Sequence, residues 1–101
     1  MPLIAVIYRY VDDAALLDEH RPAHRAHLRV LHEAGHLLVS GPLGEGGGPG
    51  ALLVFHAEGP DQVAGWLTDD PFRTLGLIAD REIRVWTPAF GADRLAPAEV
   101  G

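Results

Sequence analysis

An apolar segment near the start of the chain, residues 3–10 (LIAVIYRY), limits the folds open to it more than any other feature. The segment is short and rich in β-branched and aromatic residues, which is typical of a β-strand. Both of its alternating faces are apolar: Leu3, Ala5 and Ile7 form one, and Ile4, Val6, Tyr8 and Tyr10 form the other. A strand that is apolar on both faces is usually covered on both. We therefore expect it inside a sheet with helices on one side and a second surface on the other.

The rest of the chain alternates between helical and strand patterns. The pattern predicts a helix from the carboxylates at 11–13 to Gly35, divided by Pro22, and a second helix that begins at Pro60 and is broken by DPF at 70–72. It predicts strands at 36–42, 51–57 and 77–90, with a glycine-rich loop at 43–50 between the first two. The order strand, helix, strand, strand, helix, strand is that of the ferredoxin-like βαββαβ arrangement, an α+β fold.

This topology has a consequence for assembly. Both helices would cover one face of a four-stranded antiparallel sheet and leave an apolar face of the first and third strands uncovered. An exposed apolar patch marks an interface. We therefore expect a homodimer whose sheets pack face to face, a dimeric α+β barrel, formed by one domain over residues 1–90 with a loose tail at 91–101.

Composition excludes several classes of protein. The chain has 101 residues, which fits one domain, and no cysteine, so disulfides and thiolate metal sites are ruled out. The formal charge of −6 argues against nucleic acid and anionic membrane surfaces as partners. No apolar run reaches the roughly 18 residues of a membrane span, and the start lacks the features of a signal peptide, so we expect a cytoplasmic protein. The basic residues are all arginines, scattered along the chain, and we interpret them as codon bias rather than function.

Histidines are concentrated in one stretch: five of the six lie between positions 20 and 36. On a helix His24 shares a stripe with Leu28 and Leu31, the face that must turn toward the sheet. Three interpretations are open at this point. His24 could be a core histidine bonded to a carbonyl, a general acid or base, or, with His20 and His27 on the same side, part of a metal site. The metal site is the weakest of these, because the chain has neither an HExxH motif nor a cysteine.

Asp70 is a second candidate site residue. Pro71 follows it and pushes it out of helical conformation, so Asp70 is either a simple helix stop or a fixed carboxylate that orients an imidazole. Ser40 and Gly41 could give a pocket a small hydroxyl and a close backbone approach, and Tyr8 could give it a phenol. A turn and a packed aromatic residue explain these three equally well.

Several motifs occur here in one order. A YxxD-like segment at 10–13, RPAH at 21–24, L..L...G.LL.SGP ending at 42, a glycine-rich hairpin and DPF before a last strand with Trp occupy most of residues 3–88. The set resembles the YciI-like, or YCII-related domain, family of the dimeric α+β barrel superfamily. That resemblance implies an active site built on His24 and Asp70, with Arg21, Ser40 and Gly41 lining the same cleft.

The resemblance also suggests a reaction class. A relative in the family is similar to a dehydrochlorinase that acts on a chlorinated hydroxyhydroquinone. We therefore expect a small lyase or isomerase without metal or cofactor, in which His24 moves a proton on a small cyclic or phenolic substrate and Asp70 holds the tautomer of the imidazole. The alternative is a non-catalytic dimeric module that binds a small molecule or serves as an accessory protein. An open cleft beside His24 and Asp70 would favour the enzyme, and a sealed core would not.

Overall fold

The computed structural model describes residues 2–44 and 46–95. Four strands form one antiparallel sheet in the order β2-β3-β1-β4. The strands are β1 (Leu3–Tyr10), β2 (Leu37–Pro42), β3 (Gly50–His56) and β4 (Ile78–Trp86). The helices are α1 (Ala14–Glu33), α2 (Pro60–Trp66) and α3 (Pro71–Thr74), and a 3-10 turn, η1 (Ala92–Leu95), follows β4. This order confirms the expected α+β, ferredoxin-like fold.

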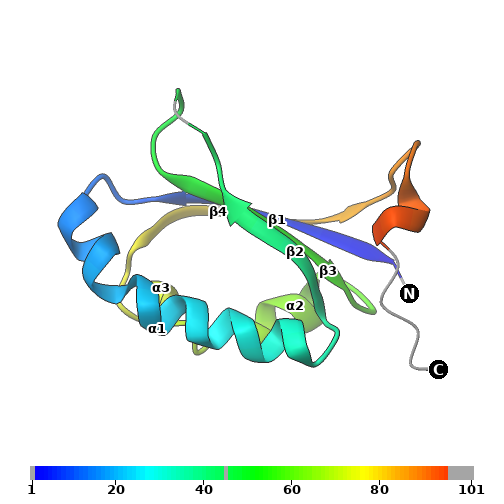
Figure 1. Ribbon diagram of the computed structural model, residues 1–101, viewed down its shortest axis with the longest axis horizontal. Coiled ribbons are helices and arrows are strands. Elements are labelled where there is room, and N and C mark those ends of the chain that lie inside the picture. The colour runs from blue at the N-terminus through cyan, green and yellow to red at the C-terminus, as the bar shows by residue number, and fades with distance from the viewer. Residues whose placement is uncertain (1, 45, 96–101) are drawn as a thin grey trace.

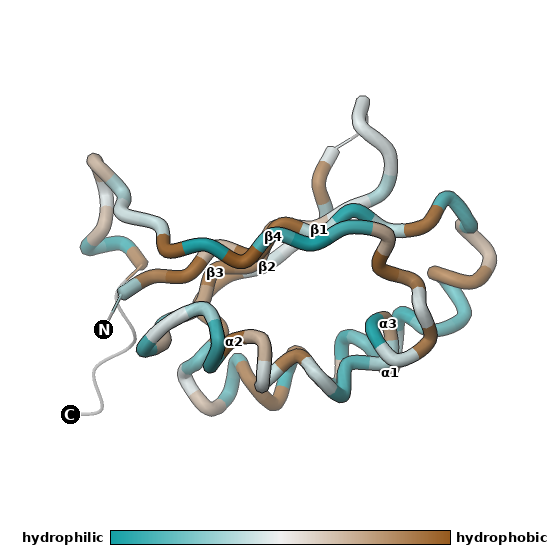
Figure 2. The backbone as a smooth tube through the Cα atoms, turned by 180° about the vertical axis from the view of Figure 1, so that it is seen from behind, coloured by the Kyte–Doolittle hydropathy of each residue, from teal (hydrophilic) through white to brown (hydrophobic). Residues whose placement is uncertain are grey.

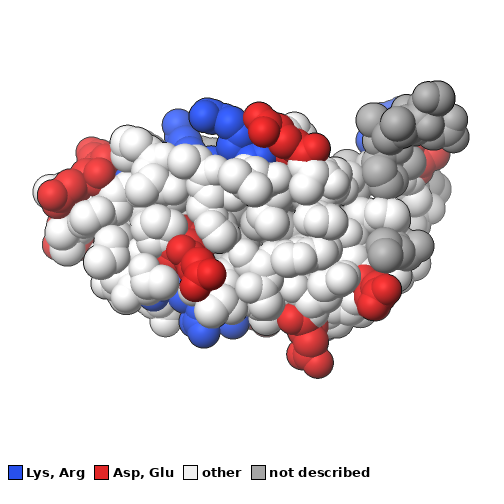
Figure 3. Space-filling view, turned by 90° about the horizontal axis from the view of Figure 1, so that it is seen from below, with Lys and Arg blue, Asp and Glu red and all other residues white. Residues whose placement is uncertain are grey.

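The molecule has two layers, with all three helices on one face of the sheet (Figure 1). The same sheet and helix layers are seen from behind in Figure 2. The core lies between them and contains alternate residues of β1 and β3 together with apolar residues of the helices: Ile4, Val6, Tyr8, Leu53, Phe55, Leu17, Val63 and Phe72. Seen from the helical side, basic side chains gather in two small groups and acidic side chains are more widely spread (Figure 3).

The opposite face of the sheet is uncovered and partly apolar. Ile7 pairs with Leu52 across β1 and β3, and their exposed fractions are 42% and 40%. Val39 and Trp86 extend this face with exposed fractions of 47% and 41%. The uncovered apolar face expected from the sequence is therefore present, and the homodimer that would cover it stays a prediction.

The expected division of the first helix at Pro22 is wrong. α1 runs without a break from Ala14 to Glu33, with Pro22 inside it. Proline removes one helical hydrogen bond, to the carbonyl four residues earlier. Here that carbonyl belongs to Asp18, and both residues are exposed, so water can replace the missing donor. The buried face of α1 keeps its packing on the sheet and holds the helix together across the proline.

The end of the chain also differs from expectation. β4 ends at Trp86 rather than continuing to residue 90, because Trp86 already pairs with Leu3, the first residue of β1. Of the expected tail at 91–101, residues 92–95 form η1 and residues 96–101 lie outside the described residues. Among the helices that the structure describes, none combines the length and hydropathy needed to cross a membrane.

Candidate active site

α1 places His24 against the sheet. The helix begins after Asp13, whose side chain accepts a hydrogen bond from the Leu16 backbone N–H at 3.2 Å. The buried residues of α1 are Leu17, His24, Leu28 and Leu31, which recur at helical spacing. His24 therefore lies in the apolar stripe and is only 5% exposed.

Asp70 reaches the same place from the opposite element. It has an extended backbone, with φ −60° and ψ 126°, and Pro71 starts the short helix α3 directly after it. Its side chain accepts a hydrogen bond from the Phe72 backbone N–H at 3.0 Å, which makes Asp70 the N-cap of α3. The turn that proline forces on the chain thus points a fully buried carboxylate toward α1.

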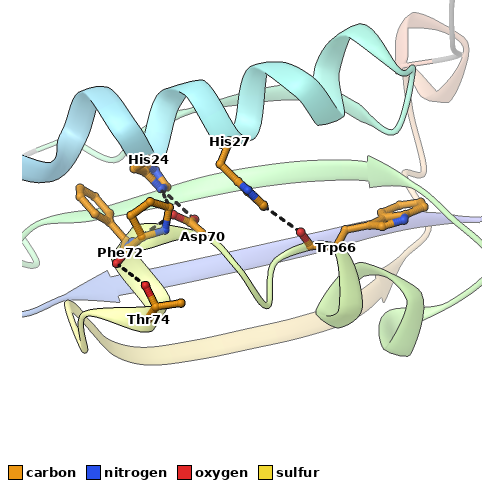
Figure 4. Close-up of polar contacts among 7 residues, drawn as sticks. His24, His27, Trp66, Asp70, Phe72 and Thr74 are labelled. Atoms are coloured by element: carbon orange, nitrogen blue, oxygen red, sulfur yellow. Dashed lines mark hydrogen bonds and ion pairs between the residues drawn. The ribbon is translucent and has the colours of Figure 1, made fainter.

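The two side chains form a buried pair (Figure 4). Nδ1 of His24 lies 2.8 Å from both carboxylate oxygens of Asp70, so Nδ1 donates and the carboxylate accepts. In a neutral imidazole this arrangement leaves the lone pair on Nε2. The Phe72 ring stacks on the imidazole at 4.0 Å between centroids, and Tyr10 meets it edge-on at 6.4 Å. Two aromatic rings and one carboxylate therefore fix the orientation of the imidazole.

The imidazole borders an open cavity of about 630 Å³ between α1 and the hairpin of β2 and β3. Its walls come from α1, including His24, Leu28 and Arg21, and from the strands, including Ser40 and Gly41. A volume of this size suits a small organic molecule. The pair is thus buried on one side and borders a ligand-sized space on the other, which is the arrangement that a general acid or base needs.

The cavity brings together most of the residues singled out from the sequence. Arg21, Ser40 and Gly41 line it together with His24, and Asp70 lies directly behind His24. Tyr8 does not line it. This side chain is 1% exposed, and its hydroxyl has no hydrogen-bond partner among the described residues.

Tyr10 stands where Tyr8 was expected. Both residues are on the inner face of β1, but Tyr8 pairs with Ala51 and Arg81 in the middle of the sheet, whereas Tyr10 is the last residue of the strand and reaches the cavity. Burial and the nearby charge of Asp70 raise the pKa of both phenols, that of Tyr10 to about 12. The Tyr10 phenol therefore remains a neutral donor or acceptor at the cavity wall near neutral pH.

Three further lining residues were missed: Arg25, Arg29 and His32. A signal for the arginines was present, because Arg21, Arg25 and Arg29 follow one another at a spacing of four residues and so lie on one side of a helix. The interpretation of the arginines as scattered overlooked that spacing. Nδ1 of His32 donates to the Leu37 carbonyl at 2.7 Å, which fixes this ring at the junction of α1 and β2.

His20 and His27, the two histidines considered with His24 as a metal site, have separate partners. Nε2 of His27 donates to the Trp66 carbonyl at 2.8 Å, and Nε2 of His20 lies 3.7 Å from the Glu19 carboxylate. Within residues 2–44 and 46–95, no three His, Cys, Asp or Glu side chains are placed to share a metal ion.

Comparison with known proteins gives a consistent picture. The model of the YCII-related domain matches residues 2–87. The chain is 28% identical over 78 residues to Protein YciI of Escherichia coli, and equally to that of Shigella flexneri, an overlap of 69% of this chain and 80% of each relative. These matches confirm the resemblance recognised from the motifs.

Two solved structures share the fold. The 5-chloro-2-hydroxyhydroquinone dehydrochlorinase of Burkholderia phenoliruptrix, in complex with 2,5-dihydroxybenzoquinone, is 32% identical and superposes with a TM-score of 0.60 over 83% of this chain and 93% of its own. Protein Atu4242 of Agrobacterium tumefaciens is 16% identical, with a TM-score of 0.50 over 89% of this chain and 95% of its own. The second likeness concerns the fold alone.

Proposed function

This chain belongs to the family of YCII-related domains, and we propose that it is a small lyase or isomerase of the dehydrochlorinase type, acting on a cyclic or phenolic substrate. One observation carries the proposal: His24 donates through Nδ1 to a fully buried carboxylate and borders a cavity of about 630 Å³. The dehydrochlorinase with the same fold supports the choice of reaction class.

The pair would act as general base and orienting carboxylate. Nε2 of His24 accepts a proton from the bound substrate, and Asp70 stabilises the imidazolium that forms. Loss of HCl from a chlorinated polyphenol takes two proton transfers and no oxidant. In the first, one phenol proton moves to the ring carbon that bears chlorine, which gives a ketone with a tetrahedral C–Cl carbon. In the second, Nε2 takes the proton of another hydroxyl, the O–H electron pair forms C=O, the ring double bond shifts to the C–Cl carbon, and chloride leaves with the electron pair of the C–Cl bond. The imidazolium then returns its proton to water.

Chloride release from 5-chloro-2-hydroxyhydroquinone under anaerobic conditions tests the proposal. We expect turnover by the wild type and a loss of about 10²–10⁴-fold in His24→Gln, the usual contribution of a positioned acid or base. His20→Gln is the matched control, because His20 lies one turn earlier on α1, and its side chain is paired with Glu19 rather than with Asp70. Equal turnover by His24→Gln and the wild type would contradict the proposal.

The same assay separates the enzyme from the alternative of a non-catalytic binding module. A wild type that binds 2,5-dihydroxybenzoquinone but releases no chloride above the buffer rate would refute the dehydrochlorinase reaction. It would favour the binding module, in which His24 and Asp70 only form hydrogen bonds to a ligand.

A further inference from the structure

The charge of the cavity is opposite to that of the chain as a whole. The formal net charge is −6, yet the residues that line the cavity include three arginines and no Asp or Glu. The three arginines are four residues apart on α1, so they lie on one wall of the cavity. A basic wall in an acidic protein raises the local concentration of anions and repels cations.

The three arginines differ in whether their charge is already neutralised. Arg21 pairs with Asp18, one turn earlier on α1. Arg25 and Arg29 are exposed, and neither forms an ion pair with a carboxylate among the described residues. Four residues on a helix correspond to about 6 Å along its axis, so these two guanidinium groups can reach a single anionic group.

A second wall of the cavity, which we call the apolar wall, consists of core residues of α1 and the β2–β3 hairpin. Leu28, Leu37, Ala51 and Leu53 line it, and each of them is buried in the core. An inorganic anion would leave this apolar wall unused. A ligand that contacts both walls favourably has a flat apolar body for the apolar residues and one anionic group for the arginines. A carboxylate suits that anionic group, because it matches the guanidinium fork in shape and hydrogen-bonding pattern.

We infer that Arg25 and Arg29 bind the carboxylate of a ring-shaped organic acid, so that the site prefers substrates with this group over uncharged rings, which can still reach His24. This inference rests on the proposed function, because it takes the cavity beside His24 as the substrate site. Arg25 follows His24 directly in α1, and Arg29 lies one turn further on. The carboxylate would therefore lie beside His24 along the helix, and the ring would lie over the apolar wall, within reach of the imidazole.

Calorimetric titration of the full chain with two probes of the same size tests the inference: 2,5-dihydroxybenzoate, an anion, and 2,5-dihydroxybenzamide, which is neutral. We expect the wild type to bind the acid about 10–100-fold more tightly, the range for hydrogen bonds to a charged group. In the double variant Arg25→Gln/Arg29→Gln the affinity for the acid should fall to that for the amide, which should not change. Arg94→Gln, which removes the same charge from η1, should retain the preference of the wild type.

Three results would overturn the inference: equal affinities of the wild type for acid and amide, a preference that survives in the double variant, or inorganic phosphate binding as tightly as the aromatic acid. None of them depends on turnover. A wild type that prefers the acid but releases no chloride refutes the proposed reaction and leaves the inference standing. A wild type that releases chloride in the assay above but binds the acid no more tightly than the amide refutes the inference and leaves the proposed reaction standing.

Discussion

Replacing Asp70 by asparagine changes one buried atom and should reverse the tautomer of His24. The carboxylate accepts three contacts, two from Nδ1 of His24 at 2.8 Å and one from the Phe72 N–H at 3.0 Å. The asparagine side chain keeps the shape but has one acceptor oxygen and one donor NH₂ group. Two groups donate to this side chain in the wild type, Nδ1 of His24 and the Phe72 N–H. In the variant only one of them can keep an acceptor oxygen, so the other must lose its hydrogen bond or give up its proton.

The asparagine amide can be oriented in two ways, and the free-energy cost of each decides which is favoured. Turning the NH₂ group toward the Phe72 N–H would remove the cap of α3, which costs about 0.5–2 kcal/mol, and leave a buried donor unsatisfied, which costs about 1–3 kcal/mol more. Keeping the oxygen on Phe72 points the NH₂ group at Nδ1 of His24 instead. The imidazole can accept this bond by moving its proton to Nε2, so every group stays satisfied and only the charge assistance is lost.

We therefore expect Asp70→Asn to fold, with a loss of about 1 kcal/mol in the free energy of unfolding, or about 4–8 °C in Tm for a domain of this size. Turnover should fall by about 10²–10⁴-fold, because a protonated Nε2 cannot accept a proton from the substrate. Long-range ¹H–¹⁵N NMR of the imidazole, assigned by comparison with His24→Gln, reports which ring nitrogen carries the proton. Asp69→Asn, at the exposed neighbouring position, is the control.

Two outcomes would refute this reasoning. If His24 kept its proton on Nδ1 in Asp70→Asn, the carboxylate would not determine the tautomer. If the proton moved to Nε2 and turnover stayed at the wild-type rate, Nε2 would not be the base. Either result would require a different chemical role for the pair.

Three other expectations concern the fold and its assembly. Gly50→Ala should destabilise the domain by about 1–3 kcal/mol in thermal unfolding, because its Cβ would lie 2.3 Å from a carbonyl oxygen of β1, whereas Gly47→Ala, with open space around it, should cost far less. The wild type should sediment as a dimer at micromolar concentration, and Leu52→Glu on the uncovered sheet face should give monomers while Val30→Glu on α1 should not; a monomeric wild type would rule out the sheet-to-sheet dimer. Since burial raises the pKa of Tyr10 to about 12, the unfolded chain loses this phenol proton first, near pH ~10, so the stabilisation is complete below that pH and declines toward about 12. Tyr10→Phe should lessen the decline in urea unfolding, and an unchanged pH profile would contradict the argument.

The fold was predictable because its strands carry strong local patterns. The alternation in residues 3–10 and the turn residues around 43–50 were sufficient to place β1, β2 and β3 within one or two residues. α3 was not predicted as a helix, since it has only four residues and no apolar period. The division at Pro22 was a wrong prediction because local propensity says nothing of the tertiary packing that holds the buried face of α1 on the sheet.

The site was predictable in part, and the limit is physical. Helical periodicity was enough to turn His24 toward the sheet, because Leu28 and Leu31 define the buried side of α1. No spacing in the sequence could show that Asp70, 46 positions away, meets its Nδ1, because that contact exists only once α1 and α3 pack together. The prediction of Tyr8 rather than Tyr10 at the cavity was wrong for a similar reason. The two residues share a face of β1, and only their distance from the end of the strand, where the cavity lies, separates them.

The site divides into a part that the fold needs and a part that it does not. Asp70 caps α3 and holds His24, so the geometry of the proposed base and the local stability of the domain depend on one carboxylate. Arg25 and Arg29 are exposed on α1 and line the cavity without contributing to the core. Substitutions at the arginines can therefore alter which molecule is bound at little cost in stability, whereas substitutions at the pair change chemistry and folding together. We therefore expect proteins with this fold to differ in ligand specificity through the positions of Arg25 and Arg29 rather than through those of His24 and Asp70.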